Sequence, residues 1–135
     1  MGELDPSSGI AARFAPRTVE HFQNPRNVGR IERPDAVVRL DDRETDTTIT
    51  LYAVLDDRAR TVQTCRFRTF GCSACIAACS VATEWLTGRE PTALLALDAA
   101  WLDAALGGLP ADKRYCAELA AAAVRGLAAE LARRD

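Results

Sequence analysis

Two stretches of the chain alternate between apolar and polar side chains, which is the pattern of strands that bury one face. In the first, 49–55, the apolar positions fall on one side: Ile49, Leu51, Ala53 and Leu55. The second, 61–70, alternates again, with Val62 expected beside Arg66 and on the opposite face from Phe67. Both stretches predict β-strands with one packed face.

A shorter apolar run at 36–40 predicts a third strand with one face in solvent. The charged residues that follow it, as far as Asp46, predict a solvated loop. A turn signal at 56–59 joins the two longer strands as a hairpin. Together these features predict a small antiparallel sheet of three strands.

Helical periodicity takes over after Gly71, beginning with a helix at 75–86. The remaining helices are expected over 17–22, from Pro91 onward, over 98–106 and over 113–134. This order predicts an α+β fold in which the helices pack on one face of the three-stranded antiparallel sheet. We predict a flexible N-terminal segment at 1–16 and a single domain over 17–135.

The composition narrows the range of functions. The chain has 135 residues, 48% of them hydrophobic, so it has enough apolar side chains to fold. Its net charge of -2 argues against binding nucleic acid through the phosphates. Met1–Pro6 lacks the basic start of a secretory signal, and no uncharged stretch is long enough to span a membrane. We therefore expect a cytoplasmic protein with neither a membrane nor a nucleic-acid partner.

Five cysteines and one histidine are the candidates for special chemistry. The cysteines are Cys65, Cys72, Cys75, Cys79 and Cys116. In a reducing compartment, a cysteine cluster indicates metal, sulfur or redox chemistry rather than a structural disulfide. Cys72 follows Gly71 at a helix start, where the helix dipole stabilises a thiolate. Cys75 completes a Cys-x-x-Cys spacing that chelates a metal or forms a redox pair.

The other candidates have plainer interpretations. Cys65 lies in the middle of a strand and Cys79 on an alanine-rich helix, so both favour the core. Cys116 heads the apolar stripe of the last helix, where a core role is again the default. His21 is interpreted as a structural histidine near a helix end.

Three motifs follow one another along the chain. The first is His-Phe-Gln-Asn-Pro-Arg-Asn-Val-Gly at 21–29, and the second is Phe-Arg-Thr-Phe-Gly-Cys at 67–72. The third comprises Leu109, Pro110, Lys113 and Cys116. In this order, over about residues 17–131, they resemble the motifs of the iron–sulfur cluster scaffold family (IscU and the N-terminal domain of NifU).

The resemblance implies a function as well as a fold. Family members are scaffolds rather than conventional enzymes. They accept sulfur as persulfide from a cysteine desulfurase, hold iron or a nascent 2Fe-2S cluster, and pass it to recipient iron–sulfur apoproteins. Three cysteines and an aspartate are the usual ligands, and the same set also holds zinc. Cys72 and Cys116 match two of the ligand cysteines, and Cys116 matches the usual persulfide acceptor.

This chain departs from the family pattern at three places. The segment that normally carries Cys-Gly-Asp is Arg-Glu-Thr-Asp-Thr-Thr at 43–48, so the first ligand cysteine is missing and Asp46 or Glu44 stands for the aspartate. Tyr115 replaces the histidine that normally precedes Cys116. Leu-Pro-Ala-Asp-Lys at 109–113 places an acid in the chaperone-recognition stretch, which argues against chaperone-driven cluster release.

We therefore hypothesise that an extra cysteine, Cys75 or Cys79, replaces the missing ligand. With Cys75, the set Cys72, Cys75, Cys116 and Asp46 offers four donors, suited to tetrahedral zinc or to a cluster with one oxygen ligand. A homodimer that bridges a cluster with Cys72 and Cys75 of each chain is another arrangement with four thiolates. The alternative functions are a zinc-bound persulfide relay and a non-catalytic paralogue that only binds the desulfurase.

Overall fold

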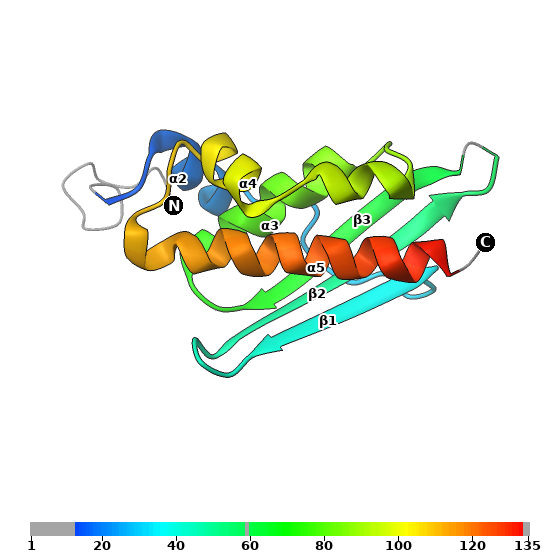
Figure 1. Cartoon of the computed structure of the whole chain (residues 1–135), viewed down its shortest axis with the longest axis horizontal. Coiled ribbons are helices and arrows are strands. Elements are labelled where there is room, and N and C mark those ends of the chain that lie inside the picture. Colours follow the sequence, from blue (N-terminus) through cyan, green and yellow to red (C-terminus); the bar gives the residue numbers. More distant parts are fainter. Residues whose placement is uncertain (1–12, 59, 134–135) are drawn as a thin grey trace.

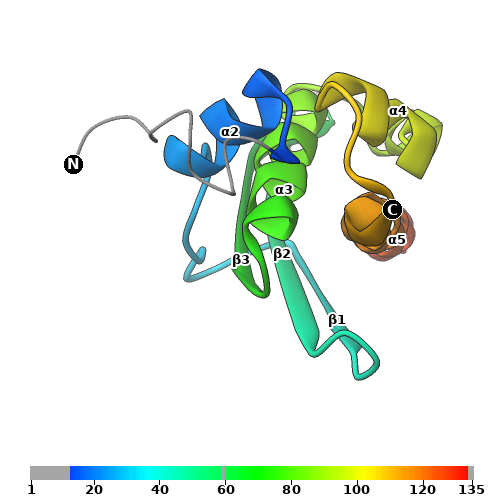
Figure 2. The ribbon, with the colours of Figure 1, turned by 90° about the vertical axis from the view of Figure 1, so that its left-hand side faces the viewer.

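A three-stranded antiparallel sheet in the order β1-β2-β3 forms one layer of the molecule (Figure 1). The computed structural model describes residues 13–58 and 60–133. The strands are β1 (Ala36–Asp42), β2 (Thr47–Asp56) and β3 (Thr61–Phe70). α3 (Ser73–Leu86) packs on β3, and α5 (Arg114–Ala132) packs on β1 and β2 (Figure 2). The predicted α+β fold, with helices over one face of the sheet, is confirmed.

Shorter elements complete the helical layer: α2 (Pro16–Gln23), the 3₁₀ helix η1 (Pro91–Ala96), α4 (Ala99–Ala105) and the 3₁₀ helix η2 (Ala111–Lys113). The helix expected from Pro91 onward is a short 3₁₀ helix, in which Leu94 is buried, and the chain becomes extended again at Leu97. Of the segment expected to be flexible, residues 1–12 lie outside the described part. Phe14 is buried, and its ring centroid lies 6.4 Å from that of Phe22.

The face assigned to Val62 was wrong. Its side chain is fully buried with Cys65 and Phe67, whereas Arg66 points to solvent. The cause is a register irregularity: Val54 pairs with Thr64, but the next residue, Leu55, pairs with Val62. Such a bulge shifts the alternation of the strand by one residue, which a strict period of two does not anticipate.

The core lies between the sheet and the helices, with α3 in its centre. Ten of the 14 residues of α3 are buried, a pattern expected of a helix surrounded by protein on most sides. The helix contacts β3, α2, α4 and α5. α5 approaches β1 closely, since a Cβ on Gly126 would lie 3.2 Å from Cγ1 of Val38. Small residues thus allow the layers to pack tightly.

The His21–Gly29 motif braces α2 and the following loop against α3 and β3. Nδ1 of His21 lies 2.8 Å from Oγ of Ser80, which also accepts a hydrogen bond from the backbone N–H of Arg26 at 2.9 Å. The backbone N–H of Gly29 donates to the carbonyl of Phe67 at 2.9 Å. Burial, followed by the nearby Arg26 charge, lowers the pKa of His21, which favours the neutral ring. The expected structural role of His21 agrees with these contacts.

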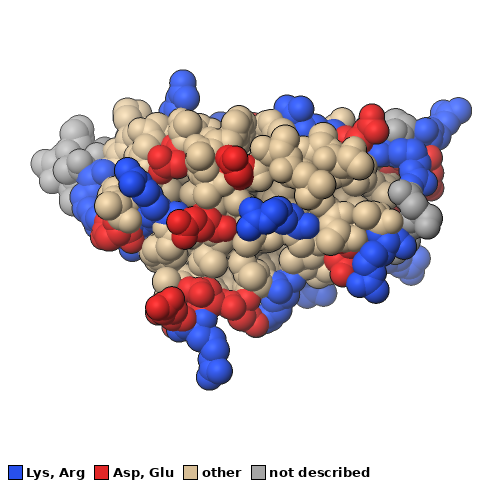
Figure 3. Space-filling model, viewed as in Figure 1, with Lys and Arg blue, Asp and Glu red and all other residues tan. Residues whose placement is uncertain are grey.

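The surface carries one clear acidic feature. Acidic side chains gather over the turn between β1 and β2, at the lower left in Figure 3, where the residues include Asp42, Glu44 and Asp46. No helix within residues 13–58 and 60–133 is long and apolar enough to cross a membrane.

Replacing Ser80 with alanine should destabilise the fold. The substitution removes the fully buried hydroxyl that serves both His21 and Arg26, and it leaves the Arg26 N–H without this acceptor, which should cost about 1–3 kcal/mol. Urea unfolding followed by circular dichroism measures the change. Ser73→Ala, the same substitution at the start of the same helix, should change stability by less than about 0.5 kcal/mol. Equal effects of the two substitutions would contradict the bracing role.

Candidate metal and cluster centre

Three cysteines meet at the end of the molecule where β3 leads into α3 and where α5 begins (Figure 1). Cys72 is the residue immediately before α3, and Cys75 lies in the first turn of that helix. Cys116 lies in the first turn of α5. The fold therefore brings together two helix starts that are 41 residues or more apart in sequence.

The sulfur atoms of these three cysteines, the thiol triad, lie within 4.8 Å of one another. The Sγ–Sγ distances are 3.0 Å for Cys75–Cys116, 3.4 Å for Cys72–Cys116 and 4.0 Å for Cys72–Cys75. With zinc–sulfur bonds of about 2.3 Å, two ligand sulfurs of a tetrahedral site lie about 3.8 Å apart. Small side-chain rotations therefore allow one metal ion to reach all three sulfurs.

The three thiols do not ionise alike. Contacts with Cys116 and then with Cys75 hold the pKa of Cys72 far below its usual range, which favours its thiolate form. The contact with Cys72 raises the pKa of Cys116. For Cys75, the contact with Cys116 lowers the pKa, but the Cys72 sulfur and burial outweigh it and raise the pKa to about 12. Of the three thiols, Cys72 is therefore the one that ionises most readily.

A tight turn at Gly71 creates this arrangement. A Cβ at Gly71 would lie 3.2 Å from Cγ2 of Thr47 and 3.5 Å from Sγ of Cys75. A larger residue would therefore push the start of β2 and the triad apart. Thr47 is buried here, and its hydroxyl lies 2.9 Å from that of Thr45. The alternation that places Ile49 and Leu51 inward, extended by two residues towards the start of the strand, already predicts that Thr47 faces inward.

Asp46 and Glu44 are exposed in the turn between β1 and β2. Asp46 has a positive φ of 56°. Within the described part of the chain, the residues whose ligand atoms meet within 4.8 Å are the three cysteines, without either carboxylate. The structure thus brings together the sulfur atoms of three of the four expected donors. The fourth, Asp46, directly precedes Thr47, whose side chain lies beside Gly71.

The remaining candidates lie outside the triad. Cys65 and Cys79 are buried in the core, and burial raises the pKa of both thiols, to about 12 for Cys65. Their expected core role agrees with this burial. The hydroxyl of Tyr115 lies 3.8 Å from Sγ of Cys72, and burial, followed by this contact, raises its pKa. Tyr115 therefore touches the site from the position where the family carries histidine.

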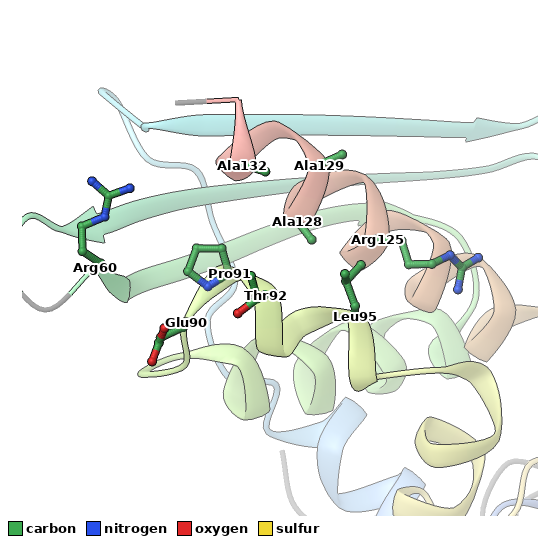
Figure 4. Close-up of a pocket in the computed structure, with 9 residues that line it drawn as sticks. All are labelled: Arg60, Glu90, Pro91, Thr92, Leu95, Arg125, Ala128, Ala129 and Ala132. Atoms are coloured by element: carbon green, nitrogen blue, oxygen red, sulfur yellow. The ribbon is translucent and has the colours of Figure 1, made fainter. Parts of the chain in front are cut away.

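The molecule also has a mainly apolar groove of about 540 Å³ between η1 and the C-terminal half of α5 (Figure 4). Pro91, Leu95 and Ala128 are among the residues that line it. Ala128 is 12 residues beyond Cys116 on α5, a distance of about 18 Å along the helix axis. The groove is thus separate from the thiol triad.

The fold and the triad define a small thiol-rich protein of the α+β class, built to hold a soft metal ion at the meeting point of two helix starts. Residues 14–134 match the model of the NifU-like N-terminal domain. This match covers most of the chain, which belongs to the family of NifU-like N-terminal domains, related to IscU.

Relatives at the sequence level are named as cluster assembly proteins. The chain is 38% identical over 112 residues to iron–sulfur cluster assembly scaffold protein IscU 1 of Archaeoglobus fulgidus, covering 83% of this chain and 72% of that protein. It is 31% identical over 122 residues to iron–sulfur cluster assembly protein 1 of Arabidopsis thaliana, covering 88% and 72%, respectively.

Solved structures show the same fold. A NifU-like N-terminal protein of Brucella abortus superposes with a TM-score of 0.72 at 20% identity, covering 95% of this chain and 100% of that one. The second structure is an iron–sulfur cluster assembly scaffold protein, described as putative, for the SUF system of Fervidobacterium islandicum. It superposes with a TM-score of 0.71 at 14% identity, covering 89% of this chain and 99% of that one.

Zinc binding at the triad should release protons. Because the pKa of Cys72 is lowered while those of Cys75 and Cys116 are raised, we expect roughly two protons to leave per zinc bound at pH 7. The affinity should consequently fall about 100-fold for each unit by which the pH is lowered near neutrality. A pH indicator in weak buffer measures the protons, and competition with a chelator measures the affinity. Cys79→Ser should leave both unchanged, and release of less than one proton by the native chain would contradict this distribution of charge.

Proposed function

We propose that this chain is an iron–sulfur cluster assembly scaffold in which Cys72, Cys75 and Cys116 hold iron and the nascent cluster. The observation that carries the proposal is the convergence of three thiol sulfurs within 4.8 Å at one end of the fold. Thiolates are the ligands that hold iron–sulfur clusters, and their softness favours iron–sulfur cargo or zinc over hard cations. Membership of the NifU-like family supports the same function.

In this proposal Cys75 replaces the missing first cysteine. Its sulfur lies 3.0 Å from that of Cys116, whereas Cys79, one helical turn further on, lies in the core. The third sulfur ligand therefore comes from the start of α3 rather than from the turn between β1 and β2. Asp46 is proposed as the fourth ligand, since the turn that carries it lies beside Gly71 and its exposed carboxylate is free of the core packing that fixes Thr47.

The acidic turn also supports delivery of a cation. Asp42, Glu44 and Asp46 gather over the β1–β2 turn (Figure 3), and this turn leads into Thr47, which lies beside Gly71. A negative potential at this end attracts ferrous ions and raises their local concentration. The extra cation then offsets the repulsion between thiolates that would otherwise keep Cys75 and Cys116 protonated.

The partners proposed are a cysteine desulfurase, which supplies sulfur, and recipient iron–sulfur apoproteins, which take the finished 2Fe-2S cluster. Both come to this chain through the family resemblance. A second candidate function, a zinc-bound sulfur acceptor, is favoured by one observation: three sulfurs within 4.8 Å, which small side-chain rotations bring to the spacing of zinc ligands. Visible absorbance of a cluster separates the first function from the second.

Anaerobic reconstitution with ferrous iron and sulfide should give the native chain visible absorbance together with bound iron and acid-labile sulfide. Cys72→Ala, Cys75→Ala and Cys116→Ala should each lose most of the cluster, because each removes a thiolate ligand. The matched control is Cys79→Ala, the same substitution on the same helix at a core position, which should keep the cluster. Unchanged iron content in Cys75→Ala would end the proposal that Cys75 replaces the missing ligand.

The fourth ligand has its own test. Asp46→Ala should lower the stability of the reconstituted cluster towards a chelator by about tenfold or more, because loss of one ligand exposes the metal. Glu44→Ala, which removes a carboxylate of the same acidic turn, should cause a much smaller change. Equal effects of the two variants would assign the carboxylates to attraction of the cation rather than to ligation.

A further inference from the structure

Cys72 and Cys75, which are separated by two residues, have the arrangement of a dithiol redox pair. Cys72 is partly exposed immediately before α3, and Cys75 is fully buried in the first turn of that helix, with its sulfur 4.0 Å from that of Cys72. An accessible thiol at a helix N-terminus, backed by a buried thiol three residues later, is suited to thiol–disulfide exchange. Metal ligation alone does not require one thiol to be exposed and the other buried.

We propose that this pair reduces sulfur delivered to Cys72 and releases it as hydrosulfide, with Cys75 as the attacking thiol. The inference rests on the proposed function, in which sulfur reaches the scaffold as a persulfide. The outer sulfur of a persulfide is two electrons more oxidised than the sulfide of a cluster, so a scaffold needs a source of two electrons. Cys75 is the residue that this chain adds to the family pattern in a position to supply a second thiol.

Exposure favours Cys72 over Cys116 as the acceptor. A thiolate must reach the outer sulfur of a partner's persulfide, and Cys116, which matches the usual acceptor of the family, is fully buried in the first turn of α5. Cys72 is the member of the triad with surface exposure. A partner can therefore reach Cys72, while Cys75 and Cys116 are buried.

The reaction balances as a simple exchange. The Cys75 thiol loses its proton, and its sulfur attacks Sγ of the Cys72 persulfide from the buried side. A Cys72–Cys75 bond forms as the bond between Sγ of Cys72 and the outer sulfur breaks. The outer sulfur leaves with the electron pair and takes up the proton as hydrosulfide. The sulfane sulfur is reduced by two electrons, the two cysteines are oxidised to a disulfide, and a dithiol reductant returns them to thiols.

Cys116 is the competing attacker, since its sulfur lies 3.4 Å from that of Cys72. Two features favour Cys75. It belongs to the same helix start as Cys72, so the new bond joins residues already held by one turn of backbone, with Cys75 N–H bonded to the Cys72 carbonyl at 3.0 Å. Reaction with Cys75 also leaves Cys116 as a thiol available to iron.

The test uses the full, reduced, metal-free chain treated anaerobically with glutathione persulfide. The native chain should release hydrogen sulfide and lose two hydrogen atoms in intact mass, and peptide mapping should locate a Cys72–Cys75 disulfide. Cys75→Ser should instead gain one sulfur atom on Cys72 and release about tenfold less hydrogen sulfide or lower. Cys79→Ser, the matched control on the same helix, should behave like the native chain. Cys75→Ala and circular dichroism separate this effect from misfolding.

Release that is unchanged in Cys75→Ser but lost in Cys116→Ser would overturn the proposal, as would a native chain that keeps the added sulfur on Cys72. The scaffold function is measured separately, by supplying iron with sulfide so that no persulfide is needed. A native chain that forms a cluster from sulfide but releases none from the persulfide retains its proposed function and loses this inference. A chain that releases hydrogen sulfide but holds no cluster gives the opposite result.

Discussion

The burial of α3 on most of its surface is the constraint on which the rest of the structure depends. The helix is enclosed by β3, α2, α4 and α5, so its position fixes the helical layer as a whole. Since β3 ends at Phe70 and α3 begins at Ser73, the sheet sets where the first turn of the helix lies. Ser80 on the same helix anchors His21 and Arg26, which tie α2 and the following loop to this centre. Two of the three thiols of the triad are thus placed at one end of a largely buried helix.

Much of the fold could be predicted because strands and helices leave periodic patterns in a sequence. Alternating apolar positions, as around Leu51, predicted the strands, and the helical spacing after Gly71 predicted the two long helices. The face of Val62 was missed because the bulge between Val54 and Leu55 is a pairing event between strands, with no local signal in either. The site was only partly predictable for a similar reason. From its own helix Cys116 is a core residue, and its meeting with Cys72 depends on how α5 packs against α3.

Three adjacent thiols cannot all ionise at low cost, because neighbouring thiolates repel one another. The contacts lower the pKa of Cys72 and raise that of Cys116, so the negative charge favours the Cys72 sulfur. A bound cation stabilises the thiolate forms, so metal binding is coupled to the release of protons from the triad. An electrophilic sulfur on Cys72 would relieve the same crowding differently, by converting two close thiols into a bond. The short distances between the sulfur atoms of the triad therefore suit both metal binding and the proposed disulfide formation.

The proposed replacement of a ligand in the β1–β2 turn by Cys75 of α3 would change the mechanical character of the site. A donor in a surface turn can swing away and let cargo leave, whereas Cys75 is fully buried in a helix that cannot shift without disturbing the core. In this chain the sulfur donors all come from two packed helix starts, and the turn contributes only carboxylates and the buried Thr47. In the proposed site, cargo would be exchanged at the solvent side, where Cys72 is partly exposed and Asp46 lies exposed in its turn. With Asp46 as the proposed fourth ligand, the movable donor would be this carboxylate, which favours release from that side.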